Sequence, residues 1–123
     1  MTAVVSSSPF RLPSAPVQAD LVAKYFRGLG DPIRLRILEL LRTEGELTVS
    51  ELVERLGLSQ PKVSNHLACL RWCGFIEARR EGRKVNNRIA DRRVGAMLEL
   101  AEALLADNAE HVAACCSIEE PKR

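Results

Sequence analysis

Apolar residues recur every three or four positions along most of this chain, and that spacing predicts helices. After the fourth helical segment the pattern changes to two short β-compatible runs on either side of Glu81-Gly82-Arg83, which predicts a β-hairpin. The expected helices cover, in chain order, residues 17–29, 32–42, 49–56, 59–73 and 92–112. The expected order of elements is therefore four helices, a hairpin and a final helix.

Capping residues mark the starts of two of these helices. Asp31 precedes Pro32, which combines an N-cap acceptor with a proline in the first turn, where a missing N–H costs nothing. Thr48 and Glu51 have the spacing of a capping box. Two short helices joined by residues 57–59 and followed by a hairpin are typical of a winged helix-turn-helix. We therefore expect a mainly α fold with a β-hairpin wing.

Composition favours a single soluble domain. The length is 123 residues, with 46% hydrophobic and 28% charged residues. No apolar run approaches the roughly 20 residues that cross a bilayer, and the N-terminus lacks the pattern of a signal peptide. We expect a cytoplasmic protein with no membrane partner, in which thiols stay reduced. The expected organisation is a flexible tail at 1–16, a winged-helix domain at 17–113 and a cysteine-containing tail at 114–123.

Charge is unevenly distributed behind a net charge of +2. Residues 59–93 carry nine Lys or Arg against three Asp or Glu, whereas residues 94–123 carry two against six. A basic middle third is the electrostatic pattern of a nucleic-acid-binding surface, although a solvated charged surface would have the same composition. The helix-turn-helix pattern favours the first interpretation, with double-stranded DNA as the partner.

The second helix of a helix-turn-helix lies in the major groove and reads bases with its N-terminal residues. Gln and Asn can pair with adenine and Lys favours guanine, while arginines at a wing suit phosphates or the minor groove. His66 would fit a hydrogen-bonded structural position equally well. The candidate DNA-binding residues are Ser59, Gln60, Lys62, Ser64, Asn65, His66, Arg79, Arg80, Arg83 and Lys84.

The first and last helices each carry an apolar stripe that a small helical core can cover only in part. Tyr25 and Phe26 belong to the first stripe, and Leu104 and Leu105 belong to the last. We expect these terminal helices to pair between two subunits and form a homodimer. The alternative is that both helices fold onto their own core.

Cys69 and Cys73 stand four residues apart in the helix that is expected to read DNA. At ~100° per residue they lie about 125° and about 85° from the core stripe of Val63, Leu67 and Leu70, so they are not ordinary core positions. Residues at this spacing lie roughly 6 Å apart on one helix face. Thiolates select soft metals, and nearby basic residues should help keep these thiols ionised. The pair therefore predicts a thiolate site for one large soft cation.

The segments "GDPIRLRILELL" and "ELTVSELVERLGLSQPKVSNHLACLRWCGFIEARREGRKVNNRIAD" resemble the ArsR/SmtB family of metal-responsive winged-helix repressors. The similarity runs from about residue 20 to 110, and the "KVSNHL" block is specific to the family when found with the "REGR" wing tip. It implies a homodimer that occupies a palindromic operator when metal-free and leaves it when a toxic metal binds. It implies no enzymatic activity and no organic small-molecule substrate.

Two metal sites of that family are not matched by this chain. Many arsenic and cadmium sensors use a Cys-x-Cys pair where this sequence has Thr48 and Ser50. Zinc sensors use an Asp-x-His and a His-x-x-Glu pair on the last helix, of which only Asp107, Glu110 and His111 remain, with different spacing. We therefore expect His111 to be a surface residue of the last helix.

The cysteine pair instead resembles the cadmium- and lead-sensing (CmtR-like) branch, whose paired cysteines lie in the same "NHLxCLxxCG" context. That branch completes its site with a cysteine from the C-terminal segment, where this chain offers Cys115 and Cys116. Neighbouring residues rarely both reach one ion without strain, so three ligands are favoured over four, with either cysteine as the third. The expected effector is Cd(II), Pb(II), Hg(II) or As(III), which spacing alone does not rank.

Other interpretations use the same cysteines. Bridging of Cys69 to Cys73, or of Cys115 to Cys116, would make a thiol redox sensor of the same fold, and a structural zinc site or packed, inert thiols are further alternatives. Cys73 and Arg79 also have the Cys-x5-Arg spacing of cysteine phosphatases. That chemistry needs a strand before the cysteine and a helix after it, the opposite of the order here. We therefore expect a regulator rather than an enzyme.

Overall fold

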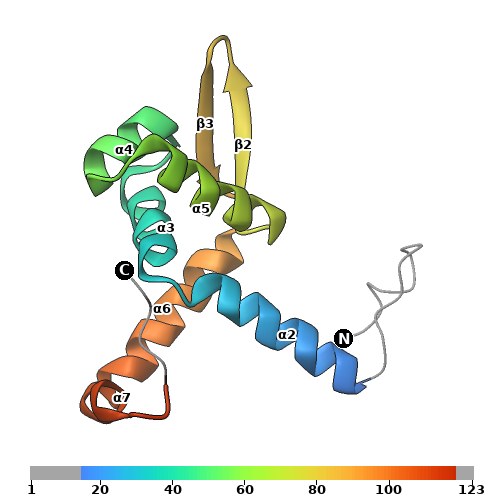
Figure 1. The fold of residues 1–123 in the computed structure, drawn as a ribbon, viewed down its shortest axis with the longest axis vertical. Helices are drawn as coiled ribbons and strands as arrows, with labels where there is room; N and C mark the ends of the chain where they lie inside the picture. The colour runs from blue at the N-terminus through green and yellow to red at the C-terminus, as the bar shows by residue number, and fades with distance from the viewer. Residues whose placement is uncertain (1–14, 119–123) are drawn as a thin grey trace.

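The computed structural model describes residues 15–118 and has a winged helix-turn-helix fold, which confirms the expected fold class. The hairpin stands away from a body of helices, and the first helix extends away from that body (Figure 1). The elements are α2 (Ala15–Leu29), α3 (Pro32–Glu44), β1 (Leu47–Thr48), α4 (Val49–Leu56), α5 (Gln60–Trp72), β2 (Ile76–Glu81), β3 (Lys84–Ile89), α6 (Arg92–Ala106) and α7 (Ala109–Ala114).

Local capping fixes the helix starts as the sequence indicates. The Asp31 carboxylate accepts from the backbone N–H of Ile33 at 2.8 Å and of Arg34 at 3.2 Å, which satisfies two donors at the start of α3. Thr48 and Glu51 form both halves of the capping box of α4. Gly57 ends α4 with φ of 68°, a left-handed conformation that glycine adopts without steric cost.

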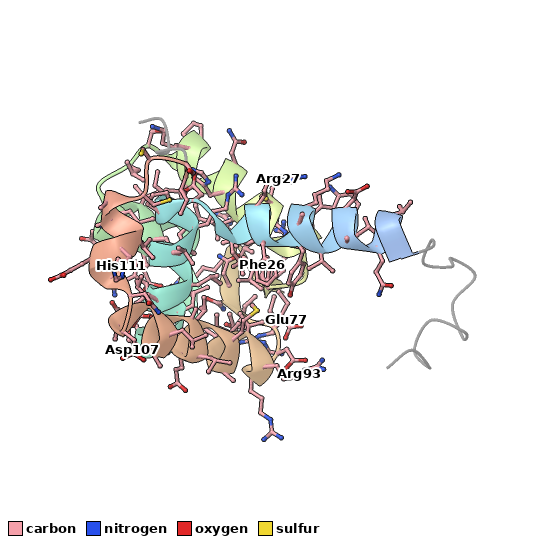
Figure 2. All side chains as sticks on the ribbon, turned by 90° about the horizontal axis from the view of Figure 1, so that it is seen from below. Phe26, Arg27, Glu77, Arg93, Asp107 and His111 are labelled. Carbon is pink, nitrogen blue, oxygen red and sulfur yellow. The ribbon has the colours of Figure 1, made fainter. Side chains whose placement is uncertain are left out.

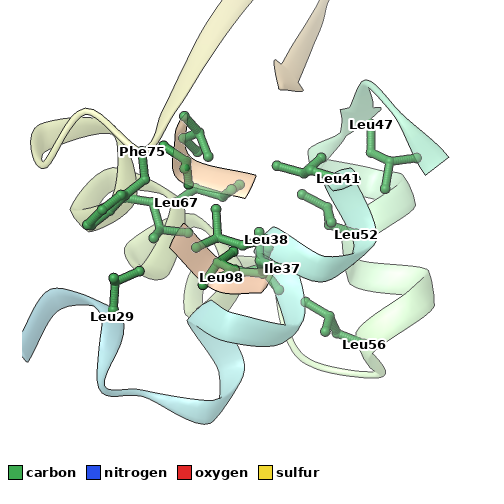
Figure 3. Close-up of a cluster of buried hydrophobic side chains, with 14 residues drawn as sticks. Leu29, Ile37, Leu38, Leu41, Leu47, Leu52, Leu56, Leu67, Phe75 and Leu98 are labelled. Carbon is green, nitrogen blue, oxygen red and sulfur yellow. The ribbon is translucent and has the colours of Figure 1, made fainter. Parts of the chain in front are cut away.

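The core lies between α3, α4, α5 and the start of α6, as Figure 3 shows. Phe75 is fully buried at the base of the wing. The centroid of its ring lies 4.6 Å from the ring centroid of Tyr25, near the end of α2. The buried hydrophobic residues are Leu29, Ile37, Leu38, Leu41, Leu47, Leu52, Leu56, Val63, Leu67, Leu70, Phe75, Ile76, Val94 and Leu98. This arrangement fixes one side of α5 and leaves its other sides for partners.

The hairpin belongs to a three-stranded antiparallel sheet in the order β1-β3-β2. The strand β1 has only two residues, Leu47 and Thr48, so no alternation of apolar and polar positions could predict it. Asn87 of β3 is fully buried, and its side-chain N–H donates to the Leu47 carbonyl at 3.2 Å. The base of the wing is thereby tied to the start of the helix-turn-helix.

The expected single helix from 92 to 112 is wrong, because the structure divides it into α6 and α7. Asp107 and Asn108, both poor helix formers, lie at the break. The side-chain N–H of Asn108 donates to the Leu104 carbonyl at 3.3 Å, and its backbone N–H bonds to Leu105 three residues back. These local bonds replace the regular helical ladder and turn the chain.

The helices α2, α6 and α7 keep apolar side chains exposed in the single subunit. The large exposed ones on these helices are Val17, Leu21, Val22, Tyr25, Phe26, Leu100, Leu104, Leu105 and Val112. The expected N-terminal tail lies outside the described residues except for Ala15 and Pro16, which open α2. Among residues 15–118, no helix is long and apolar enough to cross a membrane.

Candidate nucleic-acid interface and thiol pair

Helix α5 has a buried side and a polar side, and it contains no acidic residue. Val63, Leu67 and Leu70 are the buried positions, as the sequence indicates. The Ser59 hydroxyl caps the helix by accepting from the Lys62 N–H at 3.4 Å. Of the remaining candidate DNA contacts on this helix, Gln60, Lys62 and Asn65 are exposed, while Ser64 and His66 are half-buried. The exposed set lies in the first half of α5, where a recognition helix reads bases.

His66 is held by an interaction that the sequence did not indicate. Its Nδ1 accepts from Nε of Arg34 at 3.2 Å, and Arg34 lies 32 residues away on α3. When Nδ1 accepts, the neutral ring carries its proton on Nε2, which leaves one donor for another partner. Nδ1 of His66 therefore takes part in a structural hydrogen bond. A contact between its Nε2 and DNA stays a prediction.

The basic residues of the wing differ in their availability. Arg80, Arg83 and Lys84 are exposed at or near its tip. Arg79 instead pairs with Glu46 at 2.7 Å and with Glu81 at 3.7 Å, and the hydrogen bond to Glu46 raises the pKa of Arg79 above its ordinary value. A DNA phosphate would have to compete with these carboxylates for Arg79.

An open groove of about 760 Å³ separates the wing from α4 and the start of α5. Its lining includes the candidate contacts Gln60, Arg83 and Lys84. It also includes Ser50, in the first turn of α4, which sequence reasoning had considered only as the vacant position of a cysteine pair. The groove therefore brings the candidate contact Gln60 of α5 and the candidate contacts Arg83 and Lys84 of the wing into one lining.

The thiols of Cys69 and Cys73 lie on a flank of α5, half-buried and reduced. Cys73 packs against the end of α2, since a Cβ added at Gly28 would lie 3.2 Å from its Sγ. Burial raises the pKa of the Cys73 thiol above its ordinary value, and the neighbouring Cys69 adds to the rise, while Arg34 and Lys24 oppose it.

The expected help from basic neighbours is present at Cys73, where Arg34 and Lys24 lower the pKa of the thiol, but burial has the larger effect. Desolvation of a thiolate on the flank of the core outweighs the two cations. A cation that binds Cys73 must displace its proton, so such binding weakens as pH falls.

The tail cysteines lie at the far end of the same subunit. Cys115 is the C-cap residue of α7 and is half-buried, and Cys116 is exposed. Within residues 15–118 of one subunit, no group of three or more His, Cys, Asp or Glu side chains could hold a metal ion. Figure 1 shows α7 well separated from the end of α5. Figure 2 places His111 on the surface of α7, away from Arg93 at the start of α6.

A basic reading helix, a two-stranded wing and a helix-turn-helix core define a DNA-binding regulator, and comparison with known proteins identifies its family. The profile described as "Bacterial regulatory protein, arsR family" matches residues 31–78. The chain is 46% identical over 99 residues to a probable mercury resistance operon repressor from Streptomyces lividans, covering 80% of this chain and 78% of that protein. The chain belongs to the ArsR family of winged-helix transcriptional regulators. The related proteins that match it are regulators rather than enzymes.

Two further relatives support this assignment. The regulator CmtR from Mycobacterium tuberculosis strain H37Rv is 43% identical over 91 residues, covering 73% of this chain and 76% of that protein. The solution structure of a homodimeric winged helix-turn-helix DNA-binding domain from Mycobacterium bovis has a TM-score of 0.71 and 27% identity. The structural alignment covers 94% of this chain and 100% of that domain.

Proposed function

We propose that this protein is a metal-sensing transcriptional repressor. As a metal-free homodimer it binds a palindromic operator, and it is released when a soft metal ion binds cysteine thiolates. The observation that carries the proposal is the placement of Cys69 on α5 and of Cys73 at the C-cap of the same helix. An ion held there acts on the element that reads DNA.

The exposed apolar faces of the terminal helices support the homodimer. Phe26 of α2 is 56% exposed and Leu104 of α6 is 60% exposed, which is unusual for large apolar side chains that gather on two helices. The related domain from Mycobacterium bovis is a homodimer. Pairing of these faces would present two copies of α5 to half-sites related by a two-fold axis.

Thiolate chemistry supports a soft effector: Cd(II), Pb(II), Hg(II) or As(III). Cys115 or Cys116 supplies the third ligand from the partner subunit, because within residues 15–118 one subunit brings no third ligand to the pair. The 17–113 domain then carries dimerisation and DNA binding, and the 114–123 tail completes the metal site. A raised pKa at Cys73 argues against a redox sensor that uses the Cys69–Cys73 pair, since redox-sensing thiols have low pKa values.

The test of this proposal uses the reduced, metal-free dimer and DNA fragments from upstream of its own coding region. We expect fluorescence anisotropy to show tight binding to one palindromic fragment, with affinity that falls steeply as salt rises, because each neutralised phosphate releases counterions. Anaerobic addition of Cd(II) should release the DNA while thiolate charge-transfer absorbance grows. Binding that ignores salt, or Cd(II) that binds thiolates without releasing any fragment, would contradict the proposal.

A second prediction separates the reading helix from the wing. Gln60→Ala should reduce discrimination between operator and random DNA by about 1–3 kcal/mol, since a side chain that pairs with a base carries sequence information. Arg83→Ala should weaken binding to both DNAs about equally and flatten the salt dependence. Anisotropy titrations at three salt concentrations measure both effects. Equal loss of specificity in the two variants would show that the assignment of reading helix and wing is wrong.

A further inference from the structure

Arg34, in the first turn of α3, joins three helices through one side chain. Its Nη1 donates to the carbonyl oxygen of Gly28, near the end of α2, at 3.0 Å. Its Nε donates to Nδ1 of His66, in the middle of α5, at 3.2 Å. A planar guanidinium can make two such bonds in fixed directions, so it sets the position of α5 relative to α2.

The same side chain lies beside the thiol pair. Gly28, whose carbonyl Arg34 binds, is buried, and a Cβ at that position would lie 3.2 Å from Sγ of Cys73. The charge of Arg34 also acts on the Cys73 thiol, where it opposes the effect of burial. Arg34 therefore contacts α5 through His66 and, on its other side, the Gly28 backbone against which Cys73 packs.

We propose that Arg34 is the positioning residue that couples the thiol pair to the DNA-reading helix. This inference rests on the proposed metal-sensing function. In the metal-free dimer the bonds to Gly28 and His66 hold α5 in the orientation that fits the operator. This bridge consists of two hydrogen bonds of the Arg34 guanidinium and one close packing contact between Gly28 and Cys73.

A change at the thiol pair can reach Arg34 through Gly28, because Gly28 packs against Sγ of Cys73 and its carbonyl oxygen accepts from Arg34. A thiolate cluster of net negative charge around a bound cation would attract the guanidinium away from Nδ1 of His66 and from the Gly28 carbonyl. Metal and DNA thus compete for the position of Arg34, and each favours a different arrangement of α5.

The test compares Arg34→Lys with Arg36→Lys, a matched control at an exposed position of the same helix. Arg34→Lys keeps the charge but cannot make both bonds in the guanidinium geometry. The readouts are operator affinity with and without Cd(II), and the Cd(II) affinity of the free dimer. Wild type should show a release factor in the typical range of about 5- to 150-fold. Arg34→Lys should bind operator more weakly before metal is added, and its release factor should fall below about 3-fold.

His66→Leu removes the acceptor and should lower the release factor in the same way. The double variant Arg34→Lys/His66→Leu should lose no more than either single variant, because both changes break one interaction. In each single variant, Arg34→Lys and His66→Leu, the free dimer should still bind Cd(II) with an affinity within about threefold of wild type. A purely structural role would instead lower thermal stability and leave the release factor unchanged.

The outcomes separate this inference from the function on which it rests. If wild type releases DNA on Cd(II) addition and both variants keep the full release factor, Arg34 does not couple the sites and the inference is overturned. If wild type binds Cd(II) but stays on its operator, the metal-sensing function fails first, and the coupling role fails with it. Should Arg34→Lys not fold, His66→Leu alone decides by the same criterion.

Discussion

Cys69→Ser and Cys73→Ser are each expected to bind operator as wild type does and to stay bound when Cd(II) is added. A serine hydroxyl is nearly the size of the thiol but is a hard, neutral ligand, so a two-sulfur clamp for a soft ion is lost. Both residues are half-buried, Cys69 on α5 and Cys73 at its C-cap against the core, and because serine is nearly the size of cysteine neither change opens a large cavity. Loss of a group that only supports a metal ligand typically lowers metal affinity by about 10- to 100-fold. Loss of a ligand itself should cost at least as much, so we expect Cd(II) affinity to fall by more than about tenfold.

The measurement uses thiolate absorbance and the fluorescence of Trp72, the only tryptophan of the chain. Trp72 is 93% exposed and adjoins Cys73, so it reports on an ion at the pair. Ala68→Ser is the control, because it places a hydroxyl on the same helix and leaves both thiols intact. Serine variants that respond to Cd(II) with wild-type affinity and release would show that the pair is not the sensor.

Much of the fold could be predicted from short-range signals. The start of α3 follows from Asp31 and Pro32, and the start of α4 follows from Thr48 with Glu51, because these caps act within three residues. The break between α6 and α7 was missed, since the apolar spacing continues across it while Asn108 bonds back to Leu104. A two-residue strand such as β1 has no pattern of its own and depends on pairing with β3.

The candidate sites divide in the same way. Helical phase placed Cys69 and Cys73 outside the core stripe, and the structure shows both half-buried, with Cys73 packed against the edge of the core. The pairing of Arg79 with Glu46 and of Arg34 with His66 joins residues more than 30 positions apart, so spacing could not indicate either. The raised pKa of Cys73 could not be predicted for a related reason, because the burial of its thiol by the end of α2, which outweighs the nearby cations, depends on the fold.

The position of the third thiolate decides whether metal binding links the two subunits. Cys115 and Cys116 follow α7, on the side of the molecule away from the end of α5 (Figure 1). Replacing both tail cysteines by serine should remove most Cd(II) affinity and the release from DNA. In either single variant the remaining tail cysteine can serve as the third ligand, so part of the Cd(II) affinity should be retained. That result alone would not tell a site within one subunit from a site between two.

Mixed dimers answer this question. One protomer carries Cys69→Ser/Cys73→Ser and keeps its tail, while the other carries Cys115→Ser/Cys116→Ser and keeps its pair. Neither homodimer contains a complete site. If the site joins subunits, the mixed dimer regains one complete site per dimer, with the charge-transfer absorbance of wild type at half its stoichiometry. If each site lies within one subunit, the mixed dimer regains none.

We expect restoration, because the described part of one subunit brings no third ligand to the pair. Differently tagged protomers, purified in tandem after mixing, isolate the mixed dimer for titration with Cd(II). A mixed dimer of two tail variants, with all four serines in the tails, serves as the control that should stay unrestored. Mixed dimers that bind no Cd(II), together with a wild type that does, would show that the tail closes onto its own subunit. The proposed link across the dimer interface would then be wrong, since one protomer would hold all three thiolates.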